Sequence, residues 1–220
     1  MLGAARASFL GAAGTGGAPA NVVALVDYEG DRTVLASAGE TAATYTSGTG
    51  TLSTAQAERG SYSLVSADAE YMTLDAALGT TGCIEGFFRS SGQGAKHRMF
   101  AIGAHQETNQ CQCWLDASDA IGLRQGETTV FSVASGFSDN TWYHVAYSWT
   151  GGTGEFYANG SRISSFTQSG TYSSPIVGVG CTYNLSGYNF DGYIDCFRVS
   201  TVSRYTGSSI TVPNPNSWFS

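Results

Sequence analysis

The sequence predicts an all-β protein built as a two-sheet antiparallel jelly-roll sandwich. Helix signals are nearly absent, and short runs rich in Val, Ile, Tyr, Phe and Thr recur between clusters of Gly, Ser, Asn and Asp. A length of 220 residues suits one large β domain, and a hydrophobic share of 42% is enough to fill its core. Because so many short strands must bury their apolar faces, two packed sheets are expected.

The predicted strands follow one another at short spacing. The first run, NVVALVDYEG at 21–30, ends in a glycine turn. Two runs within 141–163 form a hairpin around TGGTG, and the Asn159-Gly160 step is a strong signal for a tight turn. The other runs lie at 60–66, 70–75, 82–90, 97–104, 110–117, 120–126, 128–135, 175–181 and 192–200.

The chain is expected to hold one domain, from residue 21 to residue 220. Residues 1–20 are rich in Gly and Ala, which predicts an arm that is flexible or docked on a partner. The ending TVPNPNSWFS holds two of the four prolines and is expected to run as an extended tail along the surface.

Charge and composition exclude some functions. The formal net charge is −7 and no run of Lys or Arg occurs, so nucleic-acid binding is not expected. No stretch has the length of apolar residues that a membrane span needs. Only 12% of residues are charged, about half the usual share. Such a surface suits permanent packing against partner proteins, or contact with sugars.

The five cysteines do not have the spacing of a disulfide scaffold or a zinc site. In CQC, Cys111 and Cys113 place both sulfurs on one face of a strand, too far apart for a direct bridge. All five are predicted to be free thiols, packed as small buried hydrophobes.

Two stretches carry a resemblance to a known family. NTWYHVAYSWTGGTGEFYANGSRI, at 140–163, resembles the central signature of concanavalin A-like jelly rolls of the laminin G type. FDGYIDCFRVSTVSRYTG, at 190–207, is similar to the family's last strand and the Arg-Tyr-Thr ending that follows it. The resemblance extends from residue 21 to the C-terminus. Its Arg-Tyr-Thr-Gly ending and Pro-containing tail resemble the variant found in tailed-bacteriophage virion proteins.

The resemblance implies a structural component of a virus particle, assembled in the host cytoplasm, which decorates the capsid or tail. Other virion proteins, further copies of the chain and host-surface glycans are the expected partners. The alternative is a stand-alone bacterial carbohydrate-binding lectin. The family topology also makes the strands at 82–90 and 192–200 neighbours. One face would then hold Cys83, Glu85 and Phe87 together with Ile194, Cys196 and Arg198. Glu85 opposite Arg198 would form a modest cross-strand charge pair.

No enzymatic activity is expected. The related glucanases carry two carboxylates on one strand, and retaining glycosidases need their pair roughly 5 Å apart. The comparable strand here holds Glu85 alone, and no Gly-x-Ser-x-Gly motif occurs. His144 is interpreted as structural.

Asp195 is the candidate metal ligand. Its strand pattern places it on one face with Phe197 and Val199, expected to look inward, where an unpaired carboxylate is costly. The resemblance implies a structural Ca²⁺ held by Asp195, Asp27 and carbonyls of the turn after the first strand, since hard oxygen ligands suit this ion. The alternative is that Asp195 accepts backbone N–H groups at a turn without any ion.

The candidate ligand-binding residues lie in the loop before the last strand: Tyr183, Asn184, Tyr188 and Asn189. Tyrosine rings stack on sugars and asparagine amides bond to them, and loops on rigid sandwiches often carry recognition. The alternative is that these tyrosines pack against the sheet or a partner subunit.

Overall fold

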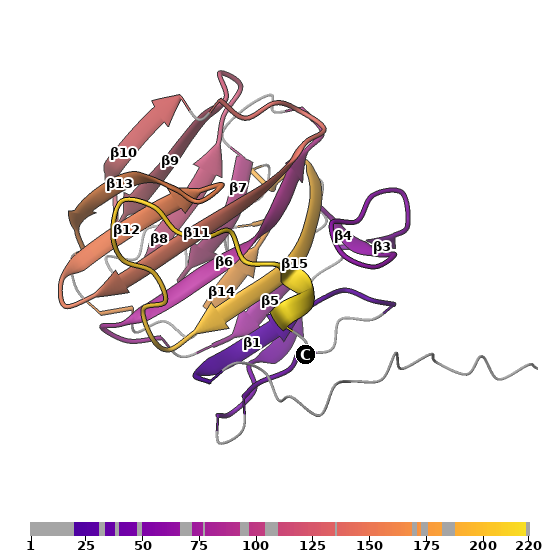
Figure 1. The fold of residues 1–220 in the computed structure, drawn as a ribbon, viewed down its shortest axis with the longest axis horizontal. Coiled ribbons are helices and arrows are strands. Elements are labelled where there is room, and N and C mark those ends of the chain that lie inside the picture. The colour runs from indigo at the N-terminus through magenta and orange to yellow at the C-terminus, as the bar shows by residue number, and fades with distance from the viewer. Residues whose placement is uncertain are drawn as a thin grey trace, which may run out of the picture.

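The computed structural model describes residues 20–30, 34–37, 40–47, 50–66, 72–76, 78–92, 97–103, 110–134, 136–168, 171–172, 176–181 and 188–218. These residues form two antiparallel sheets packed face to face (Figure 1), so the predicted all-β sandwich is confirmed. The predicted arm lies outside the described residues except for Ala20. The described residues include no helix long and apolar enough to cross a membrane.

Sheet A contains eight strands, with β15 near its middle. Its order is β13 (Ser161–Thr167), β12 (Thr153–Ala158), β11 (Trp142–Thr150), β6 (Gly82–Ser90), β15 (Gly192–Ser200), β4 (Ser63–Ser66) and β3 (Leu52–Ser53), while β1 (Val22–Val26) also pairs with β15.

Sheet B contains seven strands. Its order is β10 (Thr128–Ala134), β9 (Ala120–Gln125), β8 (Cys111–Leu115), β7 (His97–Ile102), β14 (Ile176–Val179), β5 (Met72–Asp75) and β2 (Thr44–Ser47).

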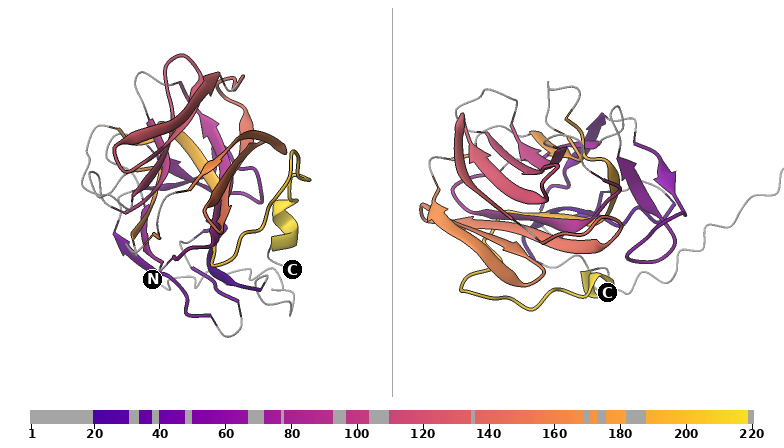
Figure 2. Two further views of the ribbon diagram at one scale, coloured as in Figure 1. Left: turned by 90° about the vertical axis from the view of Figure 1, so that its left-hand side faces the viewer. Right: turned by 90° about the horizontal axis from the view of Figure 1, so that it is seen from above.

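The core fills the space between the two sheets, which Figure 2 shows as separate layers. Successive side chains of a strand point to opposite faces, so each strand gives the core alternate residues. In β8, Cys111 and Cys113 enter the core, as the CQC spacing predicted, and Gln112 and Trp114 therefore point to the outer face of sheet B. All five cysteines are buried and free, which agrees with the predicted thiols.

Turn chemistry explains the predicted hairpins. β11 pairs with β12, and β12 with β13, around turns at Gly151-Gly152 and Asn159-Gly160. All four turn residues have positive φ, at 55°, 84°, 45° and 84°. Two consecutive positive φ values suit the tight turns that match the strand twist, and Gly and Asn adopt them most readily.

A β-bulge in β15 corrects two predictions about its faces. The register with β6 shifts between Asp195, which lies opposite Phe87, and Arg198, which lies opposite Glu85. Because the bulge adds a residue at Cys196 (φ 47°), Asp195 lies on the outer face with Phe87 and not inward with Phe197.

The predicted pairing across β6 and β15 is confirmed for Glu85 and Arg198, and Cys196 lies on the outer face with Phe87 as predicted. Ile194 faces the core, opposite Phe88, and does not share the outer face with Glu85. Cys83 lies opposite Ser200, so it does not face Cys196.

The C-terminal segment, residues 201–218, lies on the outer side of sheet A (Figures 1 and 2). Most of it lacks regular secondary structure, and it ends in a short 3-10 helix, η1 (Pro215–Trp218), which was not predicted. Trp218 is buried among Val22, Leu25, Phe87 and Cys196, and this anchors the end of the segment on the sheet.

Candidate functional site

The outer face of sheet B holds a set of polar and aromatic side chains that we call the polar face. Its members come from β7, β8 and the residue before it, β9, and the segment before β15: Arg98, Gln110, Gln112, Trp114, Arg124 and Tyr188. On β8 they alternate with Cys111, Cys113 and Leu115, which point into the core. This alternation therefore fixes which side chains lie on the outer face of the sheet.

Arg98 lies at the centre of the polar face, between two aromatic rings. Its guanidinium carbon is 5.5 Å from the ring centre of Tyr188 and 5.8 Å from that of Trp114. Its Nε donates to Oε1 of Gln112 at 2.9 Å. Because these contacts hold Arg98 in place, they also hold the Tyr188 ring at a defined position.

Burial and then the nearby charge of Arg124 lower the pKa of Arg98 to about 10. Arg98 therefore remains a cation at neutral pH, and its fork of N–H donors keeps a fixed geometry.

A chain of hydrogen bonds continues from Arg98 across the face. Gln112 donates to Gln110 at 2.5 Å, and Gln110 donates to the carbonyl of Gly126 at 3.0 Å and to Glu127 at 3.3 Å. Glu127 also binds Arg124 at 2.5 Å. The glutamines are buried, whereas the Glu127 side chain is 63% exposed, so the chain leads from the interior of the face to solvent.

The predicted ligand-binding residues have separate outcomes. Tyr183 and Asn184 lie outside the described residues. Tyr188 is 41% exposed, one of four large hydrophobic residues exposed among those described. Asn189 is buried, and its backbone forms an isolated parallel bridge with that of Arg98.

Sequence reasoning missed Arg98, Gln112 and Arg124. The signal was present in QCQCW, where Gln110, Gln112 and Trp114 alternate with residues predicted to be buried.

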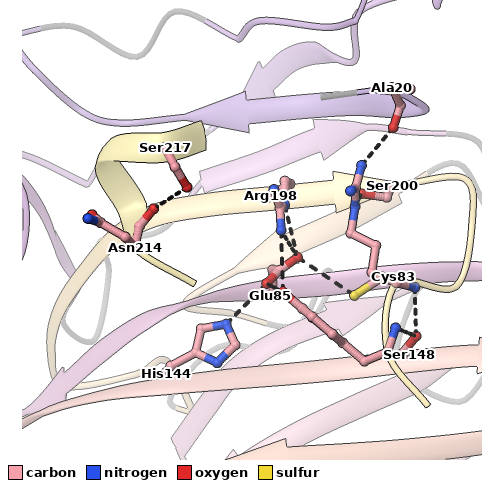
Figure 3. Close-up of polar contacts among 11 residues, drawn as sticks. Ala20, Cys83, Glu85, His144, Ser148, Arg198, Ser200, Asn214 and Ser217 are labelled. Carbon is pink, nitrogen blue, oxygen red and sulfur yellow. Dashed lines mark hydrogen bonds and ion pairs between the residues drawn. The ribbon is translucent and has the colours of Figure 1, made fainter. Parts of the chain in front are cut away.

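A second polar cluster lies on the outer face of sheet A and centres on Glu85 (Figure 3). Arg198 donates from Nε and Nη2 to Oε1 of Glu85 at 2.8 and 2.7 Å. His144 Nε2 and the Tyr205 hydroxyl bind Oε2 at 3.1 and 2.7 Å. The Trp218 ring centre lies 4.0 Å from the Arg198 guanidinium carbon.

The environment of Glu85 fits a structural role. Burial alone would raise its pKa, but the hydrogen bond from His144 and the charges of Arg198 and His144 lower it to about 2. The predicted Glu85–Arg198 pair is therefore more than a modest surface pair, because breaking a buried ion pair costs about 3–5 kcal/mol. The interpretation of His144 as structural agrees with this position.

The candidate metal ligands both bind the loop between β3 and β4. Asp195 Oδ2 accepts the N–H groups of Glu58 and Arg59 at 2.9 Å each, and Oδ1 accepts that of Cys196 at 2.7 Å. Asp27 accepts the N–H of Glu29 at 3.2 Å and the Arg59 guanidinium at 2.9 Å.

These donors do not fit a bound Ca²⁺, which needs several oxygen ligands, whereas N–H groups and a guanidinium point at both carboxylates here. Within the described part of the chain, no group of three or more His, Cys, Asp or Glu side chains is arranged to hold a metal ion. The geometry matches the alternative in which Asp195 accepts backbone N–H groups at a turn. The calcium site stays a prediction that chelation can test.

Comparisons with known proteins place the fold. Domain 4 of AbnA, a GH43 extracellular arabinanase from Geobacillus stearothermophilus, solved with arabinotriose, has a TM-score of 0.64 at 15% identity and aligns over 90% of this chain and 97% of that one. The Ruminococcus gnavus IT-sialidase CBM40 bound to α2,3-sialyllactose has a TM-score of 0.51 at 14% identity, and the alignment covers 60% of this chain and 80% of that one. The receptor-binding domain of botulinum neurotoxin type G has a TM-score of 0.55 at 13% identity, and the alignment covers 84% of this chain and 49% of that one. At these identities the likeness shows the fold alone.

No curated protein matches this sequence. A laminin G-type family model, described as the concanavalin A-like lectin/glucanases superfamily, matches residues 59–205. That range begins in the loop whose N–H groups bind Asp195, and it ends at Tyr205, which donates a hydrogen bond to Glu85. Because the match extends over more than half of the chain, the protein belongs to the concanavalin A-like lectin/glucanases superfamily.

Proposed function

We propose that this protein binds a glycan, without catalysis, through the polar face of sheet B. The observation that carries the proposal is the Tyr188 ring, which is exposed to solvent yet fixed on Arg98. An aromatic ring held in advance offers a sugar a stacking surface at little cost in conformational entropy.

The polar groups beside Tyr188 suit sugar hydroxyls. Arg124 offers donors and Glu127 offers acceptors, and both side chains are partly exposed. Planar amide, guanidinium and carboxylate groups around one ring are the kind of polar set that orients a small ligand. Two similar folds support the proposal, since the arabinanase domain was solved with arabinotriose and the sialidase module with sialyllactose.

The positions of the acidic residues support a non-catalytic role. Glu85 and Asp195 are fully buried, and both oxygens of each carboxylate accept hydrogen bonds from the protein. A glycosidase instead needs two carboxyl groups that flank the scissile bond of a bound sugar.

Tyr188→Ala tests the proposal. Wild-type protein is screened on an array of defined neutral and acidic oligosaccharides, and the strongest ligand is then titrated by calorimetry. Removing the ring should cost about 1–2 kcal/mol, and so raise Kd about five- to thirtyfold. Tyr188→Trp should retain binding, because it keeps a stacking surface.

Tyr193→Ala is the matched control. The Tyr193 ring also lies beneath an arginine, with the Arg89 guanidinium carbon 5.6 Å from its centre, but it belongs to β15 of sheet A. Its loss should leave Kd unchanged. Equal weakening by both alanine variants, or no glycan bound by the wild-type protein, would overturn the proposal.

We further propose that the protein is a component of a tailed-phage particle, which displays this face on the capsid or tail. The Arg204–Gly207 ending and the low charge of the chain support this proposal. Mass spectrometry and immunogold labelling of purified particles should find the protein in stoichiometric amount. Finding it only on or outside bacterial cells, without particles, would instead favour the stand-alone lectin.

A further inference from the structure

The loop between β3 and β4, residues 54–62, is held by three carboxylates from other elements. Asp195 accepts the backbone N–H groups of residues 58 and 59 at 2.9 Å each. Glu29 accepts those of residues 61 and 62 at 2.9 and 3.2 Å. Asp27 accepts the guanidinium of Arg59 at 2.9 Å. Most of the polar contacts that position this loop therefore end on a carboxylate.

The local backbone explains why the three carboxylates meet at one loop. Asp27 and Glu29 flank Tyr28, which is fully buried in the core and has a φ of 61°. The two acids on either side of it point away from the core and reach the loop. The bulge at Cys196 turns Asp195 to the outer face of sheet A, where it meets the same loop.

This arrangement brings together negative charges that repel each other. Carboxylates that converge on one place need donors and a nearby cation to remain ionised. In the described part of the chain, Arg59 is the one Arg, Lys or His side chain that forms an ion pair with Asp27, Glu29 or Asp195. Its side chain is 20% exposed, so solvent reaches this ion pair only in part.

Arg59 also joins the two carboxylates that were predicted to share a Ca²⁺ ion. Its backbone N–H binds Asp195 and its guanidinium binds Asp27. We propose that Arg59 supplies, from within the chain, the positive charge that a divalent cation would supply at this place. The loop is then held on sheet A without any metal.

The two kinds of cation differ in what they need from their surroundings. Ca²⁺ takes about six to eight oxygen ligands, whereas a guanidinium offers directed N–H donors and is covalently part of the chain. A chelator therefore has nothing to remove from the native protein. Without the charge of Arg59, however, the oxygens of Asp27 would lie beside two further carboxylates with no cation, and such a set of hard oxygens attracts Ca²⁺. Loss of Arg59 should thus create a dependence on calcium that the native chain lacks.

Arg59→Gln tests this assignment, because it removes the charge and leaves a carbonyl oxygen that can contact an ion. Melting of the full chain is compared in EDTA with NaCl and in CaCl₂ of equal ionic strength, so that general screening is the same. Wild type should melt at the same temperature in both buffers. Arg59→Gln should melt below wild type in EDTA, and CaCl₂ should raise its melting temperature by several degrees, because an ion that binds only the folded state stabilises it.

Arg162→Gln is the matched control. The Arg162–Glu155 pair is also partly exposed, but it joins β13 to β12 and lies outside the loop. This variant should not respond to CaCl₂. The double variant Asp27→Asn/Arg59→Gln should lose the response, since it removes a carboxylate that the ion would contact.

Proteolysis of the loop gives an independent answer. Endoproteinase Glu-C can cut after Glu58, whose side chain is exposed, once the backbone of the loop is released. Wild type should resist this cut equally in both buffers, whereas Arg59→Gln should be cut faster in EDTA than in CaCl₂, as followed by mass spectrometry. A wild-type protein that melts lower in EDTA, an Arg59→Gln protein that does not respond to CaCl₂, or an equal response of Arg162→Gln would overturn the proposal.

Discussion

Glu85→Gln is the substitution that tests most directly how much the Glu85 cluster stabilises the packing of the C-terminal segment on sheet A. It preserves the shape of the side chain but removes the charge that Arg198, His144 and Tyr205 all contact. Arg198 stays buried beneath Trp218, now without its carboxylate partner. An uncompensated buried charge is strongly destabilising.

The size of the effect follows from the pKa of Glu85. The folded protein lowers this pKa from 4.5 to about 2, and each unit corresponds to 1.36 kcal/mol. The ionised carboxylate therefore contributes about 3 kcal/mol to folding at pH 7. This contribution is complete above the unfolded pKa of 4.5 and disappears as the pH falls through the folded value near 2.

Urea unfolding at several pH values measures both parts of the prediction. At pH 7, Glu85→Gln should lower the free energy of unfolding by about 3 kcal/mol, and the difference from wild type should shrink between pH 5 and pH 2. Glu155→Gln is the control, since the Glu155–Arg162 pair is partly exposed and should contribute less than about 1 kcal/mol. Equal losses in the two variants, or a Glu85 difference that does not change with pH, would refute this account of the cluster.

Three further predictions concern buried groups. Burial raises the pKa of Asp195 from 3.8 to about 6 despite its backbone hydrogen bonds. Protonation of Asp195 should therefore raise the free energy of unfolding by up to about 3 kcal/mol as the pH falls from 7 to 4. In urea unfolding, Asp195→Asn should not show this dependence on pH. Because N–H donors and a guanidinium contact Asp195 and Asp27, EDTA should leave the melting curve unchanged. A melting temperature lower by several degrees in EDTA would instead support the calcium site. Burial raises the pKa of all five thiols, so thiol titration should find none reactive in the native protein and five after denaturation, and a count of three or one would reveal a disulfide.

Features set by local sequence were predictable. The β11–β12–β13 hairpins follow from Gly-rich and Asn-Gly turns, whose backbone preferences act within a few residues. Alternation alone likewise placed Cys111 and Cys113 in the core. The strands β2 and β3 were missed, because TYTS and LS are too short to show a periodic pattern.

Features set by contacts between distant segments were not predictable. The bulge at Cys196 depends on how β15 pairs with β6, and it reversed the face predicted for Asp195. The surroundings of Glu85 depend on Tyr205 and Trp218, which reach it only after the chain has turned back over sheet A. For the candidate site, Tyr188 was predicted because it is an aromatic residue in a loop. Arg98, which fixes its ring, belongs to a strand 90 residues earlier and gave no local signal.

The outer faces of the two sheets differ in what covers them, and this difference supports the proposed binding surface. On sheet A, the C-terminal segment buries Trp218, encloses the Glu85 cluster and covers the start of β13. Those polar groups therefore bind one another and contribute stability. On sheet B, the buried polar chain ends at the exposed side chains of Glu127 and Tyr188. A ligand that contacts the exposed Tyr188 and Glu127 need not displace any of the contacts that stabilise sheet A. Glu85→Gln should therefore change stability alone, and Tyr188→Ala should change binding alone.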